Sequence, residues 1–143
     1  LAAAPAAARA QGGAGTQDGG EPAATLLYQN FPNPFPASAA AAAGGLGTCI
    51  WFDLGRPGPV RVELFTLRGD RVRTLVPGPG FLAAALPAGR YGRAAAGSNS
   101  GCDPRLAWDG TADDGRVVPP GVYLLRLRAD GTSQVKKVVF RGR

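Results

Sequence analysis

Three aspartates in the last third of the chain are the residues whose type and spacing best suit chemistry, because carboxylates are preferred ligands of calcium. Asp109, Asp113 and Asp114 fall within one glycine-containing segment, residues 109–115. Their spacing differs from that of an EF-hand loop. Aspartate and glycine are also ordinary residues of tight turns, so turn geometry is the simpler interpretation and calcium binding the weaker one.

The composition gives little support to catalysis. Among its 143 residues the chain has no histidine, the side chain that most often transfers protons near neutral pH and binds metals. The sequence contains no nucleophile elbow, phosphate-binding glycine loop or paired-carboxylate site. We therefore expect a non-catalytic protein that uses no cofactor and no resident metal.

The basic charge balance is compatible with nucleic acid, an anionic membrane surface or an acidic protein partner, and also with a simple arginine-rich solvated face; the distribution of the arginines disfavours nucleic acid. The formal net charge is +6, but the arginines are spread over several predicted strands instead of forming one tract. The tripeptide Arg68-Gly69-Asp70 matches an integrin-binding motif. These residues lie at the tip of a predicted hairpin, so the requirements of a tight turn are sufficient to explain them without an adhesive function.

Two cysteines suggest where the protein resides. Cys49 and Cys102 form no C-x-x-C pair, and no histidine could complete a zinc site, which leaves a disulfide or two buried thiols. The small apolar segment 1–11 contains Ala8-Arg9-Ala10, typical of a signal-peptide cleavage site, although an alanine-rich arm is equally consistent. Export favours the disulfide, so we predict a Cys49–Cys102 bond in an extracytoplasmic protein. No window has the length of a membrane span.

Composition divides the chain in two. Residues 1–24 are mostly small and are predicted to form a flexible arm, whereas residues 25–143 alternate apolar runs with glycine-rich turns. In residues 60–67, Val60, Val62 and Leu64 alternate with Arg61 and Glu63, which indicates a half-buried strand with its charges in solvent.

The same reasoning gives about seven short strands, which fits an all-β sandwich. The clearest strands span residues 49–54, 60–67, 71–76, 121–129 and 133–141, residues 86–91 resemble the entry to a strand, and residues 55–59 and 68–70 are predicted turns. The predicted core consists of Val60, Val62, Leu64, Val72, Leu75, Trp108, Tyr123, Leu125 and Leu127.

The stretch "LLYQNFPNPFPAS", residues 26–38, excludes a helix because Pro32, Pro34 and Pro36 lack an N–H and fix φ. The residues that precede prolines are pushed toward extended conformations. We therefore expect an extended lead-in segment whose aromatic side chains pack on residues further along the chain.

The order of segments resembles a known family. Residues 27–35 ("LYQNFPNPF"), "VRVELFTLRGDRVRTLV", "LPAGRY" and "WDGTADDGRVVPPGVYLLRL" are similar to the immunoglobulin-like domain of flagellar hook-capping proteins. The same pattern occurs in C-terminal sorting domains of bacterial type IX secretion. The resemblance covers residues 26–141. It departs from the family in residues 92–105, an insertion of small residues that we interpret as a loop specialised for one partner.

The resemblance implies an immunoglobulin-like antiparallel sandwich in which Phe31 and Phe35 of the lead-in strand pack against the sandwich edge. We expect an exported interaction module that serves as an accessory subunit of a cell-envelope complex; the alternative is a sorting domain recognised by the secretion machinery. Partner contacts are predicted from the arm, the lead-in and the insertion, with Phe31, Asn33, Phe35, Arg93 and Arg105 as the contacting residues.

Overall fold

Three long antiparallel strands form the centre of the protein: β6 (Gly58–Thr66), β11 (Gly121–Ala129) and β12 (Thr132–Gly142). The computed structural model describes residues 21–36, 47–82, 85–93 and 101–142. Strand β7 (Arg71–Val76) returns beside β6 through the predicted turn at residues 68–70. Gly69 has φ +97° there, a conformation that a glycine adopts without strain.

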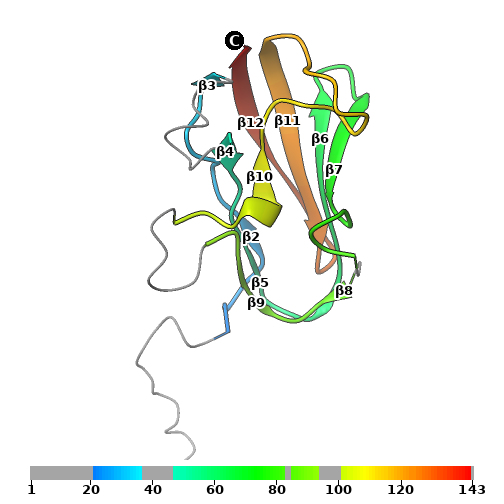
Figure 1. Cartoon of the computed structure of the whole chain (residues 1–143). Coiled ribbons are helices and arrows are strands. Elements are labelled where there is room, and N and C mark those ends of the chain that lie inside the picture. The colour runs from blue at the N-terminus through cyan, green and yellow to red at the C-terminus, as the bar shows by residue number, and fades with distance from the viewer. Residues whose placement is uncertain (1–20, 37–46, 83–84, 94–100, 143) are drawn as a thin grey trace, which may run out of the picture.

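The strands build two layers that face each other (Figure 1). The large sheet has the order β3-β12-β11-β6-β7, and β8 pairs with the start of β6. A three-stranded sheet, β2-β5-β9, and a pair, β4 with β10, make the opposite layer. The remaining elements are β2 (Leu26–Leu27), β3 (Phe35–Pro36), β4 (Thr48–Cys49), β5 (Phe52–Leu54), β8 (Ala85–Leu86), β9 (Gly89–Tyr91), the 3-10 helix η3 (Pro104–Leu106) and β10 (Ala107–Trp108).

One hydrophobic core fills the space between the layers. All nine residues predicted for the core are buried, and the all-β sandwich is confirmed. The strand register explains the burial, because Val62 faces Leu127 and Leu64 faces Leu125 on the inner side of neighbouring strands. The core extends from Leu27 to Phe140, so it unites the whole described chain.

The structure corrects three details of the expected sandwich. The predicted strand 49–54 is divided into β4 and β5, because Cys49 pairs with β10 whereas Phe52 pairs with β2 and β9. The predicted turn 55–59 is shorter, since Gly58 and Pro59 already belong to β6 and pair with β8. Strand β3 runs parallel to β12, so the sandwich is not antiparallel throughout. The immunoglobulin-like topology stays a prediction.

A further correction concerns Glu63, which the alternation placed in solvent. Its residue exposure is only 3% although it lies on the outer face of β6. Arginine side chains on β6 and β11 cover it, as described below, so outward orientation does not mean hydration here.

The inner face of β6 supplies the first testable consequence. Leu64 is completely buried, so Leu64→Ala is expected to lower the free energy of unfolding by roughly 2–5 kcal/mol. Leu67→Ala, at a position that is 62% exposed, is the matched control and should cost within about 0.5 kcal/mol. Chemical denaturation of the two variants measures both values, and equal costs would contradict the assigned register.

Candidate functional site

Side-chain amides hold the lead-in segment along the edge of β12 that does not pair with β11. Asn33 Oδ1 accepts the N–H of Val139 at 2.8 Å, and Asn33 Nδ2 donates to the carbonyl of Lys137 at 3.1 Å. Pro32 and Pro34 flank Asn33 and lack an N–H, so the asparagine amide replaces the missing ladder bonds. The predicted partner residue Asn33 is therefore engaged within its own chain.

Gln134, further along β12, also binds the lead-in through its side-chain amide. Its Oε1 accepts the N–H of Leu27 at 2.8 Å, and its Nε2 donates to the carbonyl of Thr25 at 2.9 Å. Pro22 is also buried, so packed structure begins before residue 25, where composition placed the boundary of the domain.

The two phenylalanines of the lead-in have opposite environments. Phe35 is completely buried, with ring centroids 5.6 Å from Trp108 and 5.0 Å from Phe140. Its predicted packing is confirmed, and its predicted role in partner binding is wrong because no part of it is accessible. Phe31 is 65% exposed, so the prediction that its ring packs on the sandwich edge is wrong.

The main chain of Phe31 is nevertheless fixed. Its N–H donates to the carbonyl of Cys49 at 3.2 Å, and its carbonyl accepts the N–H of Cys49 at 2.7 Å. Cys49 and Cys102 are joined by the predicted disulfide, with a Cα–Cα distance of 5.9 Å. The bond ties β4 to the segment that leads into η3, and Trp51 and Ala107 pack against it. The aromatic ring thus projects from a well-anchored part of the backbone.

The other predicted partner residues, Arg93 and Arg105, are paired within the chain. Arg93 lies 3.4 Å from Asp53. Arg105 forms an ion pair with Asp103 at 2.7 Å and stands over the ring of Phe81 at 4.3 Å. The hydrogen bond from Arg105 lowers the pKa of Asp103 and raises that of Arg105. The predicted roles of residues 1–20 and 94–100 in binding lie outside the described residues.

A polar cluster surrounds Asp53 on β5. This carboxylate is 4% exposed and accepts hydrogen bonds from Tyr28 Oη at 2.6 Å and from Arg90 Nη1 at 3.0 Å. The hydrogen bond to Asp53 raises the pKa of Tyr28. Arg93 also lies beside this carboxylate. Because Tyr28, Arg90 and Arg93 link the lead-in and the end of β9 to Asp53 on β5, the cluster stabilises the smaller sheet.

The three aspartates considered for calcium serve turn geometry instead. Asp109 Oδ1 accepts from the backbone and hydroxyl of Thr111, whereas Asp113 Oδ1 accepts the N–H of Thr74 on β7. Asp114 accepts the N–H of Arg116 in its own turn. Among the described residues no group of three histidine, cysteine or acidic side chains is placed to hold a metal ion.

The W-D-G sequence also has a structural role. Gly110 has φ +86°, and a Cβ at this position would lie 2.5 Å from the ring of Phe140. Only glycine fits so close to the core ring without a shift of its neighbours.

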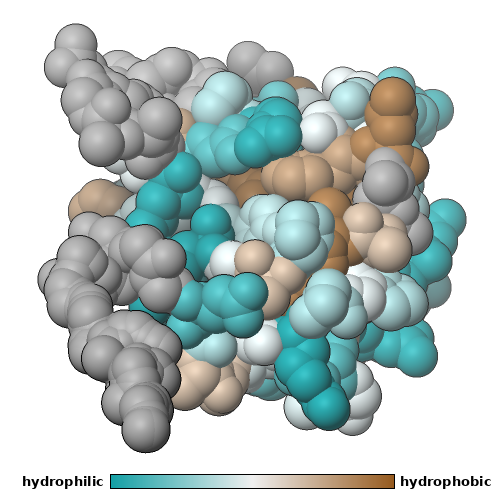
Figure 2. Space-filling model, turned by 90° about the horizontal axis from the view of Figure 1, so that it is seen from below, coloured by the Kyte–Doolittle hydropathy of each residue, from teal (hydrophilic) through white to brown (hydrophobic). Residues whose placement is uncertain are grey.

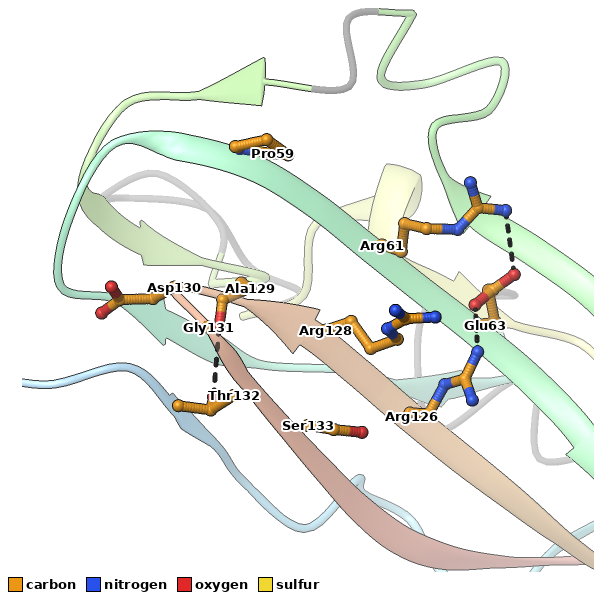
Figure 3. Close-up of a pocket in the computed structure, with 10 residues that line it drawn as sticks. All are labelled: Pro59, Arg61, Glu63, Arg126, Arg128, Ala129, Asp130, Gly131, Thr132 and Ser133. Atoms are coloured by element: carbon orange, nitrogen blue, oxygen red, sulfur yellow. Dashed lines mark hydrogen bonds and ion pairs between the residues drawn. The ribbon is translucent and has the colours of Figure 1, made fainter.

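Sequence reasoning did not find the charged depression on the outer face of the large sheet (Figure 3). It is an open hollow of about 750 Å³. Its lining comprises Pro59, Arg61, Glu63, Arg126, Arg128, Ala129, Asp130, Gly131, Thr132 and Ser133. The alternation had shown which side chains point outward. It gave no sign that arginines from two strands would converge on one carboxylate.

Glu63 is the centre of this cluster. Its Oε2 accepts from Arg61 Nη2 at 3.0 Å and its Oε1 from Arg126 Nη2 at 3.0 Å. Burial of the carboxylate opposes its ionisation, but the two arginines together outweigh that cost and hold the pKa of Glu63 below its ordinary value. The carboxylate is therefore ionised at neutral pH.

Apolar side chains gather on another surface, the end of the sandwich seen from below in Figure 2. Leu82, with 86% exposure, is the most exposed large apolar residue of the described chain. It follows the short turn in which Gly78 and Phe81 exchange backbone hydrogen bonds. No comparable anchoring by a disulfide exists there among the described residues.

No helix of the described residues has the length and apolar character needed to cross a membrane. Comparison of the sequence with protein-family models and with curated proteins finds no match.

The amide of Asn33 generates the second testable consequence. Asn33→Ala removes the acceptor of the Val139 N–H and one donor to the Lys137 carbonyl, so it is expected to cost about 1–3 kcal/mol of unfolding free energy. Gln29→Ala removes a second donor to the same carbonyl and a donor to Asn30 Oδ1 but no acceptor of a backbone N–H, so it is the control and should cost less. Equal stability of the Asn33 variant and the wild type would show that the amide does not hold the lead-in.

The lowered pKa of Glu63 predicts a pH dependence. A carboxyl with a lower pKa in the folded state stabilises the fold above its unfolded pKa, near 4.5, and this contribution is lost as the pH falls through the folded value. The stability advantage of the wild type over Glu63→Gln should therefore be present at pH 7 and shrink below about pH 4. Denaturation across this range measures it, with Glu21→Gln, an exposed position, as control. An advantage that grows in acid would contradict the assignment.

Proposed function

We propose that the chain is a non-catalytic interaction module, an exported structural or accessory subunit that docks on a larger protein complex of the bacterial cell envelope. The observation that carries this proposal is the exposed aromatic ring of Phe31 on a fixed backbone. Large aromatic side chains dominate the energetics of protein interfaces. A ring whose backbone is already ordered loses little conformational entropy when it is buried by a partner.

The surroundings of Phe31 support this function. Two backbone hydrogen bonds link it to Cys49, and the disulfide links Cys49 to Cys102. On the far side of the lead-in, Asn33 is bonded to β12 and Phe35 is buried in the core. The segment is thus anchored both at Phe31 and after it, on either side of the exposed ring's attachment to the sandwich.

The disulfide supports an extracytoplasmic location. Disulfides persist in oxidising compartments and are rare in reducing ones. The sequence separation of 53 residues means that the bond closes a long loop, for which the chain-entropy model gives about 4 kcal/mol of stabilisation. A protein that relies on such a bond is suited to the periplasm or the cell surface.

The proposal predicts that Phe31→Ala weakens assembly while the fold is retained. We expect at least a tenfold loss of affinity for the partner, since interface hot spots typically contribute ~2 kcal/mol or more. Leu67→Ala is the matched control, because Leu67 is similarly exposed (62%) on the hairpin that joins β6 and β7.

The measurement is in situ cross-linking in the native envelope followed by quantitative identification of the proteins that co-purify with the tagged full chain. Melting temperatures of both variants should match that of the wild type within a few degrees. Equal recovery of partners by the Phe31 variant and the wild type would overturn the proposal. Recovery of secretion machinery alone would favour the sorting-domain alternative.

A further inference from the structure

The charged depression holds more positive charge than its single central carboxylate can neutralise. Strand register places Arg61 beside Arg128 and Glu63 beside Arg126 on the outer face of β6 and β11. Arg71 of β7 adds a further guanidinium 3.9 Å from the carboxylate. Glu63 supplies one negative charge, and both of its oxygens already accept hydrogen bonds.

Arg128 is the free cation of the cluster. Within the part of the chain that the structure describes, it has no hydrogen bond, ion pair or aromatic contact, and it is exposed. Figure 3 shows its side chain on the same face as Arg61 and Arg126, with no dashed line to any of the residues drawn. In the same cluster, Arg126 Nε is buried and has no hydrogen-bond partner. The exposed guanidinium of Arg128 therefore offers unused donors at the surface, whereas Arg126 Nε is buried.

The second carboxylate of the lining does not supply the missing acceptor. Asp130 forms an ion pair with Arg56 at 2.9 Å and accepts the hydroxyl of Thr25 at 2.9 Å. Its carboxylate points away from the three arginines in Figure 3. Within the described residues nothing supplies an acceptor for Arg128, so its donors are open to solvent and to a partner.

We propose that this depression binds carboxylate side chains of an extended acidic segment of a partner protein. The inference rests on the proposed interaction function and names a second contact surface and its chemistry. Guanidinium groups bind carboxylates through paired, charge-assisted hydrogen bonds, and Arg128 with Arg61 presents two neighbouring forks. Val135, 50% exposed and opposite Arg126 on β12, adds apolar surface that a peptide side chain would cover.

The same face suits nucleic acid poorly. Binding of single strands relies on exposed rings on which bases stack. Phe65 is the aromatic residue that the register places beyond Glu63 on this face, and the guanidinium of Arg126 stands over its ring at 4.5 Å. Protein carboxylates need no such stacking surface.

The test uses the full chain and a fluorescein-labelled peptide with four Glu-Val repeats, followed by fluorescence anisotropy. We expect binding that weakens as salt increases, and no binding of the Gln-Val peptide of equal length. Arg128→Gln should weaken binding at least about tenfold. Arg128→Lys keeps the positive charge but loses the paired N–H donors of the planar guanidinium, so it should weaken binding by a smaller factor.

Arg68→Gln is the matched control. Arg68 is also exposed and without a partner among the described residues, but it lies at the opposite end of β6, so its loss should change affinity by less than about twofold. Equal affinities of the Arg128 and Arg68 variants would overturn the inference, with melting temperatures confirming that both are folded. Tighter, Arg128-dependent binding of an oligothymidylate of equal charge would also overturn it.

This experiment is independent of the test of the proposed function. The peptide titration needs no native partner, whereas the Phe31 experiment needs no acidic peptide. If Arg128→Gln leaves peptide affinity unchanged while Phe31→Ala still reduces recovery of partners, only the acidic-segment site is overturned. If Arg128→Gln weakens peptide binding while Phe31→Ala leaves recovery unchanged, only the envelope-docking function is overturned.

Discussion

The complete burial of Trp108 is the constraint on which the two layers depend. Its indole ring lies 5.6 Å from Phe35, 5.9 Å from Phe140 and 5.3 Å from Tyr123, measured between ring centroids. These partners belong to β3, β12 and β11, so one side chain of the small layer contacts three strands of the large sheet. The indole N–H donates to the carbonyl of Thr111 at 2.8 Å. This bond allows the ring to be buried without an unsatisfied polar group.

The lead-in segment derives its geometry from this cluster. Phe35 enters the aromatic core at one end, and the backbone of Phe31 is bonded to Cys49 at the other. Between them Asn33 replaces ladder bonds that the neighbouring prolines cannot form. Core packing, a disulfide and a side-chain amide together convert a proline-rich stretch into a fixed platform. The exposed ring of Phe31 is the consequence on which the proposed function rests.

Local sequence patterns predicted most of the central sheet but little of the surface. Alternation identified the inner positions of β6, because a period of two residues determines the buried face, and runs of apolar and β-branched residues located β7 and β11. The same pattern placed Glu63 in solvent, since nothing local reveals that Arg126, 63 residues away, would cover it. Phe31 and Phe35 could not be told apart either, because both precede a proline. Only the pairing with β4 and β12 gives them opposite environments.

The central claim is that the lead-in is a fixed part of the sandwich and presents Phe31 from a rigid backbone. Amide hydrogen exchange of Phe31, Cys49 and Val139 tests it most directly, because each N–H donates to an acceptor that exists only if the lead-in is docked. These three amides are expected to exchange as slowly as those of β6 and β11. Exchange at the rate of an unprotected loop, with β6 and β11 still protected, would contradict the claim.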